Sequence, residues 1–231
     1  MIGAEFWKSY LEVYDVLNKL PAYRQFVSDV CDELATSQGD LVLDAGCGTG
    51  NVSLRVSEAG GRVVALDYCL GALEDHRAKD GDSSPVLADV ARQLPFADGC
   101  FDRIVSSNVL FALPAESQRY ALREFRRVLK PGGTIVLANM LRGRHGVKTA
   151  ANVIRDGVRA DGLRATLAKM TRLMPDMVKM AYYNAKLERE RSHHRFGIDE
   201  QRQLLEEEGF HLVSETRIVY SGQAALNSAC K

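Results

Sequence analysis

The chain has 231 residues, of which 46% are hydrophobic and 26% are charged, so it can bury one large core and does not have the composition of a disordered protein. Its thirty basic and thirty acidic residues give a formal net charge of zero, which excludes an overall field that would attract nucleic acid. No apolar run approaches the roughly 20 residues of a membrane span and the start does not resemble a signal peptide, so we expect one domain over residues 1–231 and a cytoplasmic location.

The N-terminal segment predicts two helices. Residues 5–20 have the apolar spacing of an amphipathic helix, and Pro21 is expected to end it. Residues 23–34 predict a second amphipathic helix. We expect residues 1–37 to form a helical cap on the rest of the fold.

Short apolar runs alternate with helical stretches over residues 41–136. The runs LVLDAG, RVVALD, PVLADV, FDRIVSS and GTIVLAN are rich in Val, Ile and Leu and have no polar face, which is typical of strands buried on both sides of a parallel sheet. Helical patterns lie between them at residues 51–59, 69–79 and 116–130. This order predicts a doubly wound α/β fold.

The C-terminal segment predicts one helix and two strands. Residues 200–208 form the helix, which Gly209 ends. The runs at 211–220 and 223–229 read as strands joined at Ser221-Gly222. We expect them to close the sheet as an antiparallel hairpin.

A glycine-rich turn follows the first predicted strand. That strand ends in Asp44 and runs into Gly46-x-Gly48-x-Gly50 before a helix, and because glycines carry no Cβ, the backbone there can approach a ligand closely. About twenty residues later a second strand ends in Asp67, whose carboxylate can accept hydrogen bonds from both hydroxyls of a ribose. Together these features predict a nucleoside pocket.

Other interpretations of the glycines remain open. They can mark a plain tight turn, with Asp67 capping the next helix. A phosphate-binding loop is excluded, because no lysine follows the glycines. An NAD fingerprint has its third glycine three positions after the second, whereas Gly48 and Gly50 are two apart, so an NAD-dependent oxidoreductase is the less favoured alternative.

LVLDAGCGTGN resembles the first motif of class I S-adenosylmethionine (SAM)-dependent methyltransferases. ADVARQLPFADGCFDRIVSSNVLFAL and LREFRRVLKPGGTIVLAN resemble the group that includes ubiquinone and menaquinone biosynthesis methyltransferases and many small-molecule enzymes. The resemblance covers most of the chain. It implies a Rossmann-like, mostly parallel seven-stranded sheet, SAM as cofactor, and methyl transfer to a small-molecule or lipid-like acceptor.

The resemblance also assigns roles to residues. Gly46 and Gly48 would pass beneath the methionine part of SAM, Asp44 would hold its ammonium group, and Asp67 would bind the ribose. Tyr68 would lie against the adenine, and Asp89 with the Val90 backbone would read the adenine edge. The full set of expected cofactor residues is Tyr14, Asp44, Gly46, Cys47, Gly48, Asn51, Asp67, Tyr68, Asp89, Val90 and Asn108.

Two of these residues have an alternative. Tyr14 resembles an N-terminal tyrosine that closes over SAM in some relatives, and it can equally be a packing residue of its helix. Cys47 is expected to be a small apolar filler rather than a nucleophile.

The five cysteines are scattered and never form a C-x-x-C pair, and no acidic cluster has metal-ligand spacing, so we expect neither a zinc site nor another metal.

The implied reaction is an in-line displacement in which the acceptor attacks the sulfonium methyl group of SAM. The methyl group is already activated, so no particular catalytic residue is required. If the acceptor needs a base, the candidates are His145, His193 and His194, and the favoured alternative is that they belong to a solvated basic surface. No nucleic-acid tetrapeptide D/N-P-P-Y/F is present, which favours a small-molecule acceptor.

Residues 142–195 are electrostatically distinct, with thirteen Lys and Arg against five Asp and Glu. We expect a helical lid here, over the acceptor, with Pro175 breaking it into two helices near Met174. The lid predicts an amphiphilic or acidic acceptor and peripheral contact with a membrane surface, and the alternative is plain packing on the core. Its apolar stripe is Leu163, Leu167, Met170, Met174 and Met177.

A third function stays open beside the methyltransferase and the oxidoreductase, namely a non-catalytic scaffold that binds SAM. Intact cofactor residues do not exclude it. The identity of the acceptor, the methylated atom and the oligomeric state are not indicated by any pattern in the chain.

Overall fold

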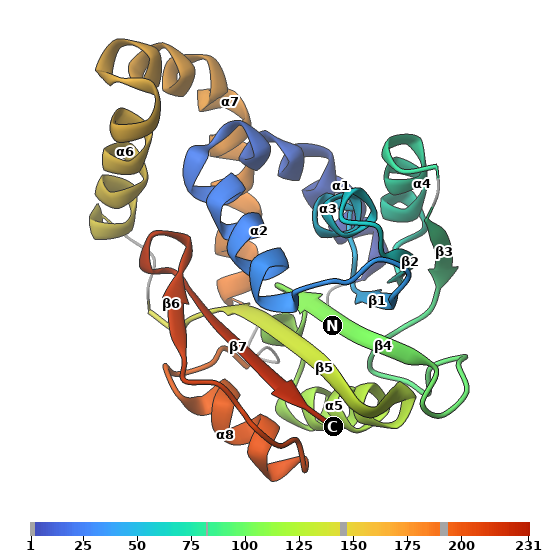
Figure 1. The fold of residues 1–231 in the computed structure, drawn as a ribbon. Coiled ribbons are helices and arrows are strands. Elements are labelled where there is room, and N and C mark those ends of the chain that lie inside the picture. The colour runs from blue at the N-terminus through green and yellow to red at the C-terminus, as the bar shows by residue number, and fades with distance from the viewer. Residues whose placement is uncertain (1–2, 82, 144–146, 190–193) are drawn as a thin grey trace.

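The structure is a computed structural model and describes residues 3–81, 83–143, 147–189 and 194–231. At its centre is a seven-stranded sheet with the order β3-β2-β1-β4-β5-β7-β6 (Figure 1). The first five strands run parallel, and β7 runs antiparallel to β5 and β6, so the predicted fold class is confirmed. The strands are β1 (Leu41–Ala45), β2 (Arg62–Asp67), β3 (Ser84–Leu87), β4 (Phe101–Ser107), β5 (Leu129–Met140), β6 (Arg217–Val219) and β7 (Ala224–Cys230).

Alternate residues of the central strands face opposite sides of the sheet. Val42 of β1 belongs to one apolar cluster and its neighbour Leu43 to the other, and both are fully buried. The helices on the two faces explain why these strands have no polar side. The first cluster packs under α2 (Pro21–Leu34) and α3 (Asn51–Glu58), and the second under α5 (Ala115–Val128) and α8 (Glu200–Glu207) (Figure 1). Beside them lie α4 (Leu70–Lys79) and η2 (Leu110–Ala112).

The N-terminal cap differs from the prediction at the end of its first helix. The helix expected over residues 5–20 ends earlier, as α1 (Ala4–Tyr14), and continues as a short 3₁₀ helix η1 (Asp15–Lys19). Pro21 does not only end this segment but also begins α2 at its first position. A proline there loses nothing, because the first N–H groups of a helix have no partner within the helix.

The C-terminal hairpin is shorter than predicted. The strand expected over residues 211–220 is reduced to β6, because Leu212 takes a left-handed backbone conformation with φ of +49° and interrupts the extended chain. Beyond it, η3 (Tyr220–Gly222) makes the turn into β7.

The lid consists of two helices, α6 (Val147–Asp161) and α7 (Leu163–Arg189). The predicted break at Pro175 is wrong, because α7 continues through this proline. Proline removes only one N–H group from the helix, and α7 stays intact on both sides of Pro175 because it packs against α1. The break lies at Gly162, whose φ of +81° is a left-handed conformation that favours glycine.

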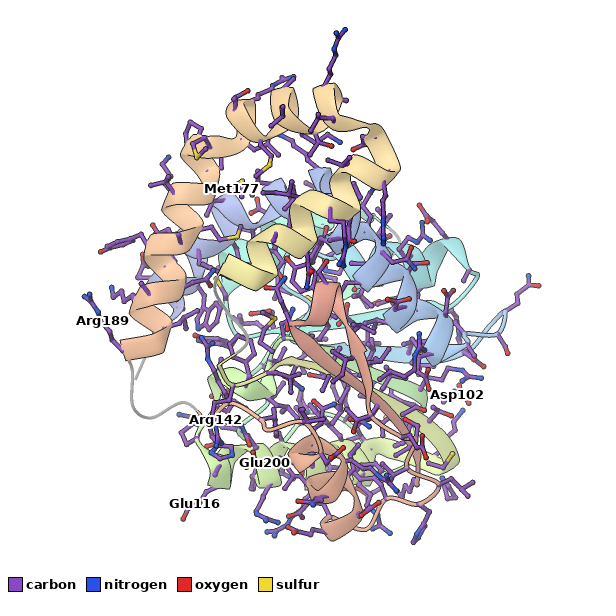
Figure 2. All side chains as sticks on the ribbon, turned by 90° about the vertical axis from the view of Figure 1, so that its left-hand side faces the viewer. Asp102, Glu116, Arg142, Met177, Arg189 and Glu200 are labelled. Atoms are coloured by element: carbon purple, nitrogen blue, oxygen red, sulfur yellow. The ribbon has the colours of Figure 1, made fainter. Side chains whose placement is uncertain are left out.

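The predicted apolar stripe of α7 is also not its buried face. Leu163, Leu167 and Met174 are exposed, whereas Leu173, Met180 and Leu187 are buried. Of the predicted stripe, Met177 packs against the core cluster beneath α1 (Figure 2).

The two ends of the lid lie side by side. Leu141 pairs with Phe196 in an isolated bridge, and the guanidinium of Arg142 donates to the carbonyl of Arg195 and forms an ion pair with Glu200 (Figure 2). The lid is thus an excursion between β5 and α8. In the part of the chain that the structure describes, no helix is long and apolar enough to cross a membrane.

Candidate functional site

A cavity of about 670 Å³ opens at the carboxyl ends of the parallel strands. This is the edge where open α/β sheets bind ligands. The cavity extends from Asp89, after β3, to Gln223, before β7, so it spans most of the width of the sheet. All eleven residues expected at the cofactor line it: Tyr14, Asp44, Gly46, Cys47, Gly48, Asn51, Asp67, Tyr68, Asp89, Val90 and Asn108.

The glycine turn, residues 44–50, forms the floor of this central cavity. Gly46 has a φ of +82°, and a Cβ there would lie 2.2 Å from Cγ2 of Val109. Its N–H and that of Cys47 both donate to the Leu66 carbonyl, at 2.7 and 3.0 Å. Of the residues that the structure describes, only Leu11 would come within 4 Å of a Cβ on Gly48, at 3.5 Å, so the backbone of Gly48 is open toward the cavity.

Asp67, at the end of β2, is buried and already bonded by the backbone. Its Oδ2 accepts from the Gly48 N–H at 2.9 Å, and its Oδ1 accepts from the Cys69 N–H at 2.9 Å. Burial raises the pKa of this carboxyl group. Each oxygen can accept a further hydrogen bond, so Asp67 holds the turn and the start of α4 and can still bind the hydroxyls of a ribose.

Asp44, at the end of β1, is a buried acid that accepts hydrogen bonds from Ser53. The Ser53 hydroxyl donates to its Oδ2 at 2.6 Å. Burial raises the pKa of Asp44 to about 6, with a smaller contribution in the same direction from Asp67. The group is therefore ionised at neutral pH, and a buried anion of this kind favours a cation beside it.

The third acid, Asp89, is held in a turn after β3. Its Oδ1 accepts from the Ala91 N–H at 2.9 Å, while Oδ2 lies 3.7 Å from Nε of Arg92. Across the cavity mouth, Tyr68 receives a hydrogen bond from Trp7, and burial raises its pKa. An aromatic ring and a carboxylate at one mouth can stack on a flat base and accept a hydrogen bond from its amino group.

The N-terminal cap is fastened to the glycine turn through Asp15. Its carboxylate accepts from the Thr49 hydroxyl at 2.7 Å and from Nδ2 of Asn51 at 3.4 Å, and it pairs with Lys79. Asn51 also donates to the Tyr23 hydroxyl at 3.3 Å. Asn51 was expected at the cofactor. It lines the cavity, and its side chain is bonded to Asp15 and Tyr23. Sequence reasoning missed Asp15, although it follows Tyr14 directly.

Asn108, after β4, has two unusual features. It is a non-glycine residue with a φ of +58°, and its N–H donates to the Ala138 carbonyl at 2.7 Å. Its Oδ1 is buried and, among the described residues, has no hydrogen-bond partner. Strained residues and unpaired buried acceptors collect at ligand sites, because the ligand completes the hydrogen bond.

Of the three histidines considered as a possible base, the structure describes only His194. His145 and His193 lie outside the described residues. The Nε2 of His194 pairs with Oε1 of Glu200 at 2.5 Å, its ring packs edge-on against Phe196, and it is not among the residues that line the cavity. As a base His194 was only a conditional candidate, and its neighbour Arg195 lines the cavity instead.

Sequence reasoning missed the far end of the cavity. Past Asn108 the lining comes from β5, α7 and the turn before β7, and it is mainly apolar and aromatic. No local motif marks these residues, since the fold brings them together from segments 80 residues apart (140 to 220). The residues that we call the acceptor end are Met140, Met180, Tyr220 and Gln223.

SAM fits the residues of this site. The buried anion Asp44 suits its ammonium group, and the free Oδ1 of Asn108 can accept a hydrogen bond at the same end. The backbone of Gly48 is open and leaves room for the methionine part of SAM. Asp67 and Asp89 supply hydrogen-bond acceptors for the ribose and the adenine.

Comparison with known proteins agrees with this chemistry. Residues 43–137 match a family described as "Methyltransferase domain". A demethylmenaquinone methyltransferase of Paenarthrobacter aurescens is 38% identical over 129 residues, which cover 54% of this chain and 49% of the relative. The chain spans about half the length of the curated relatives that it matches.

Solved structures share the fold along nearly the whole chain. A chain from the complex between the Haloferax volcanii Trm112 methyltransferase activator and a methyltransferase aligns with a TM-score of 0.70 at 18% identity, covering 100% of this chain and 99% of that one. The 1,6-didemethyltoxoflavin-N1-methyltransferase of Burkholderia thailandensis, solved with S-adenosylhomocysteine, aligns with a TM-score of 0.65 at 18% identity, covering 98% and 85%.

The matched family segment begins in β1, at the glycine turn, and ends in β5, so it contains Asp44, Asp67, Asp89 and Asn108. This segment is similar to methyltransferase domains, and the residues that line the cavity fit SAM.

Proposed function

We propose that the chain transfers a methyl group from SAM to a small-molecule acceptor, and that residues 1–231 act as one domain with a helical cap at 1–37 and a lid at 142–195. The observation that carries this proposal is the continuous cavity. One end offers acids and glycine backbone to a nucleoside, and the other end is apolar and aromatic. Two ligands of different character can therefore meet inside it.

The proposed reaction is an in-line displacement. SAM supplies a methyl group that its positive sulfur has already activated. The residues of the chain hold the two reactants in place and keep water out. Asp44 and Asn108 bind the methionine end of SAM, and Tyr14 and Met180 cover the cavity from the cap and the lid. Holding two reactants in line can lower the barrier by about 7–11 kcal/mol, so positioning alone is a sufficient source of catalysis.

The test of this function is mass spectrometry of a host metabolite extract incubated with the protein and SAM carrying an isotopically labelled methyl group. We expect one or a few metabolites to gain the label. The control is Asp67→Ala, which should abolish most of the labelling. Bound SAM without labelling of any metabolite would instead favour a SAM-binding scaffold, and this proposal would be wrong.

For Asp89 we expect a specific loss of adenine recognition. Asp89→Ala should raise the dissociation constant of S-adenosylhomocysteine about tenfold, because a carboxylate that accepts from the adenine amino group is removed. An analogue whose purine lacks that amino group should bind the wild type and the variant equally well in calorimetry. If the variant still prefers the adenine compound as strongly as the wild type does, Asp89 does not read adenine.

The outer face of α7 suggests an amphiphilic acceptor. Five of its apolar residues are exposed and recur at helical spacing, with exposed basic residues beside them. Such a surface can rest on an anionic membrane and bring a lipid-like acceptor to the cavity. The apolar residues are Leu163, Leu167, Met174, Val178 and Tyr182, and the basic ones are Arg164, Arg172 and Lys179.

Sedimentation with liposomes tests this surface. We expect the protein to bind anionic liposomes at low ionic strength and to be released at high ionic strength, because salt screens exposed charges. Arg172→Glu with Lys179→Glu should abolish binding, whereas Arg55→Glu with Arg77→Glu, exposed on α3 and α4, should not. Equal binding by both double variants, or no binding by the wild type, would leave α7 without a membrane role.

A further inference from the structure

Tyr220 occupies an unusual place in the acceptor end of the cavity. It lies in the turn between β6 and β7, and it lines the cavity together with the lid residue Met180. In the sheet, β4 and β5 separate β7, which follows Tyr220, from the strands β1 and β2 that carry Asp44 and Asp67. Tyr220 is thus on the side where we expect the second ligand.

The backbone at Tyr220 is strained. Tyr220 and Ser221 both have a φ of +53°, and Gly222 follows with +91°, so three consecutive residues lie in the left-handed region. Only the glycine adopts this conformation without strain. A local strain of this kind persists only where surrounding contacts hold it, and such sites often serve a ligand.

The contacts that hold the turn come from the lid. The Ser221 hydroxyl donates to Oδ2 of Asp156 at 2.6 Å, and Nδ2 of Asn152 donates to the Ser221 carbonyl at 3.1 Å. Asp156 and Asn152 lie one turn apart on α6, so both hydrogen bonds to Ser221, the residue next to Tyr220, come from one face of this helix.

The ring of Tyr220 is fixed, while its hydroxyl group is available. The ring stacks on Phe26 with centroids 5.2 Å apart and meets Tyr23 edge-on at 5.8 Å. Among the residues that the structure describes, none forms a hydrogen bond with the Tyr220 hydroxyl. A rigid ring with a free hydroxyl in a cavity offers apolar contact and one hydrogen bond to a ligand.

We propose that Tyr220 contacts the methyl acceptor and helps to determine which acceptors the enzyme takes, and that α6 positions it through Asp156 and Asn152. This inference rests on the proposed function. It gives α6 a defined role: the helix sets the conformation of the turn, and the turn sets the place of the ring and hydroxyl. The acceptor group that fits is a planar ring bearing a hydroxyl or carbonyl oxygen.

The test uses 2-naphthol as a fluorescent planar phenol, titrated into protein that is saturated with S-adenosylhomocysteine. We expect Tyr220→Ala to weaken 2-naphthol binding about tenfold and Tyr220→Phe to weaken it about threefold, because the first loses ring and hydroxyl and the second only the hydroxyl. Affinity for S-adenosylhomocysteine should not change. Tyr120→Ala, which changes an exposed tyrosine of α5, is the matched control and should bind 2-naphthol like the wild type.

The coupling to α6 has its own readout. Asp156→Ala should weaken 2-naphthol binding, Asp156→Glu should restore part of it, and Asp156→Ala combined with Tyr220→Ala should be no weaker than Tyr220→Ala alone. Full additivity of the two changes would remove Asp156 from the proposal. Equal binding of 2-naphthol to wild type and Tyr220→Ala, or no binding to the wild type, would overturn the role of Tyr220. Failure of the wild type to bind S-adenosylhomocysteine would separately contradict the proposed function.

Discussion

Replacing Asp67 by alanine is expected to weaken binding of SAM by about 1.5–3 kcal/mol, roughly tenfold to a hundredfold in dissociation constant, because the ribose hydroxyls lose a charged acceptor. The same change removes the acceptor that holds the Gly48 and Cys69 N–H groups, so the glycine turn should also become less well ordered. Calorimetric titration with S-adenosylhomocysteine measures the effect.

Two variants separate binding from folding in this experiment. Asp67→Asn keeps one oxygen that can accept from one of the two backbone N–H groups, so it should be more stable than Asp67→Ala and lose part of the affinity. Asp75→Ala removes an exposed acid from α4 and should change nothing. Wild-type affinity in a folded Asp67→Ala protein would show that this residue does not bind the ribose.

Replacing Asp44 by asparagine is expected to stabilise the ligand-free protein at pH 7.5 by about 1–3 kcal/mol. The carboxyl group has a pKa of about 6 in the folded protein and an ordinary value of 3.8. Between those values the folded state holds a proton that the unfolded state releases, so the free energy of unfolding of the wild type falls as the pH rises from about 4 to 6. Asparagine removes this loss and can still accept from Ser53.

The measurement is urea unfolding of wild type and Asp44→Asn at pH 4 and pH 7.5. The stability difference should be present at pH 7.5 and vanish near pH 4. The variant should also bind S-adenosylhomocysteine more weakly, and wild-type affinity should fall below about pH 6 as Asp44 loses its charge. A variant that is less stable than the wild type at pH 7.5 would contradict the picture of a buried anion whose hydrogen bonds from Ser53 do not offset its burial.

The sheet and the cofactor half of the cavity could be predicted because their signals are local in sequence. Buried parallel strands need continuous apolar runs, and a close ligand approach needs glycine, as Gly46 shows with Val109 only 2.2 Å from an added Cβ. Asp44 and Asp67 end neighbouring strands, so the topology brings both to the same edge of the sheet.

The lid and the acceptor half could not be predicted in this way. Pro175 is the stronger helix breaker by propensity, but packing of α7 outweighs the one hydrogen bond it lacks, and the break falls at Gly162. Tyr220 lies in a turn of three left-handed residues, and the middle one, Ser221, is held by Asp156, which is 65 positions earlier in the chain. No short-range pattern contains that contact.

The most direct test of the central claim is the shift in melting temperature on adding S-adenosylhomocysteine or NADH to separate samples of the protein. A ligand that binds only the folded state raises the free energy of unfolding, by about 2.7 kcal/mol at a hundred times its dissociation constant. Our account predicts that S-adenosylhomocysteine raises the melting temperature and that NADH does not. A rise with NADH and none with S-adenosylhomocysteine would contradict it.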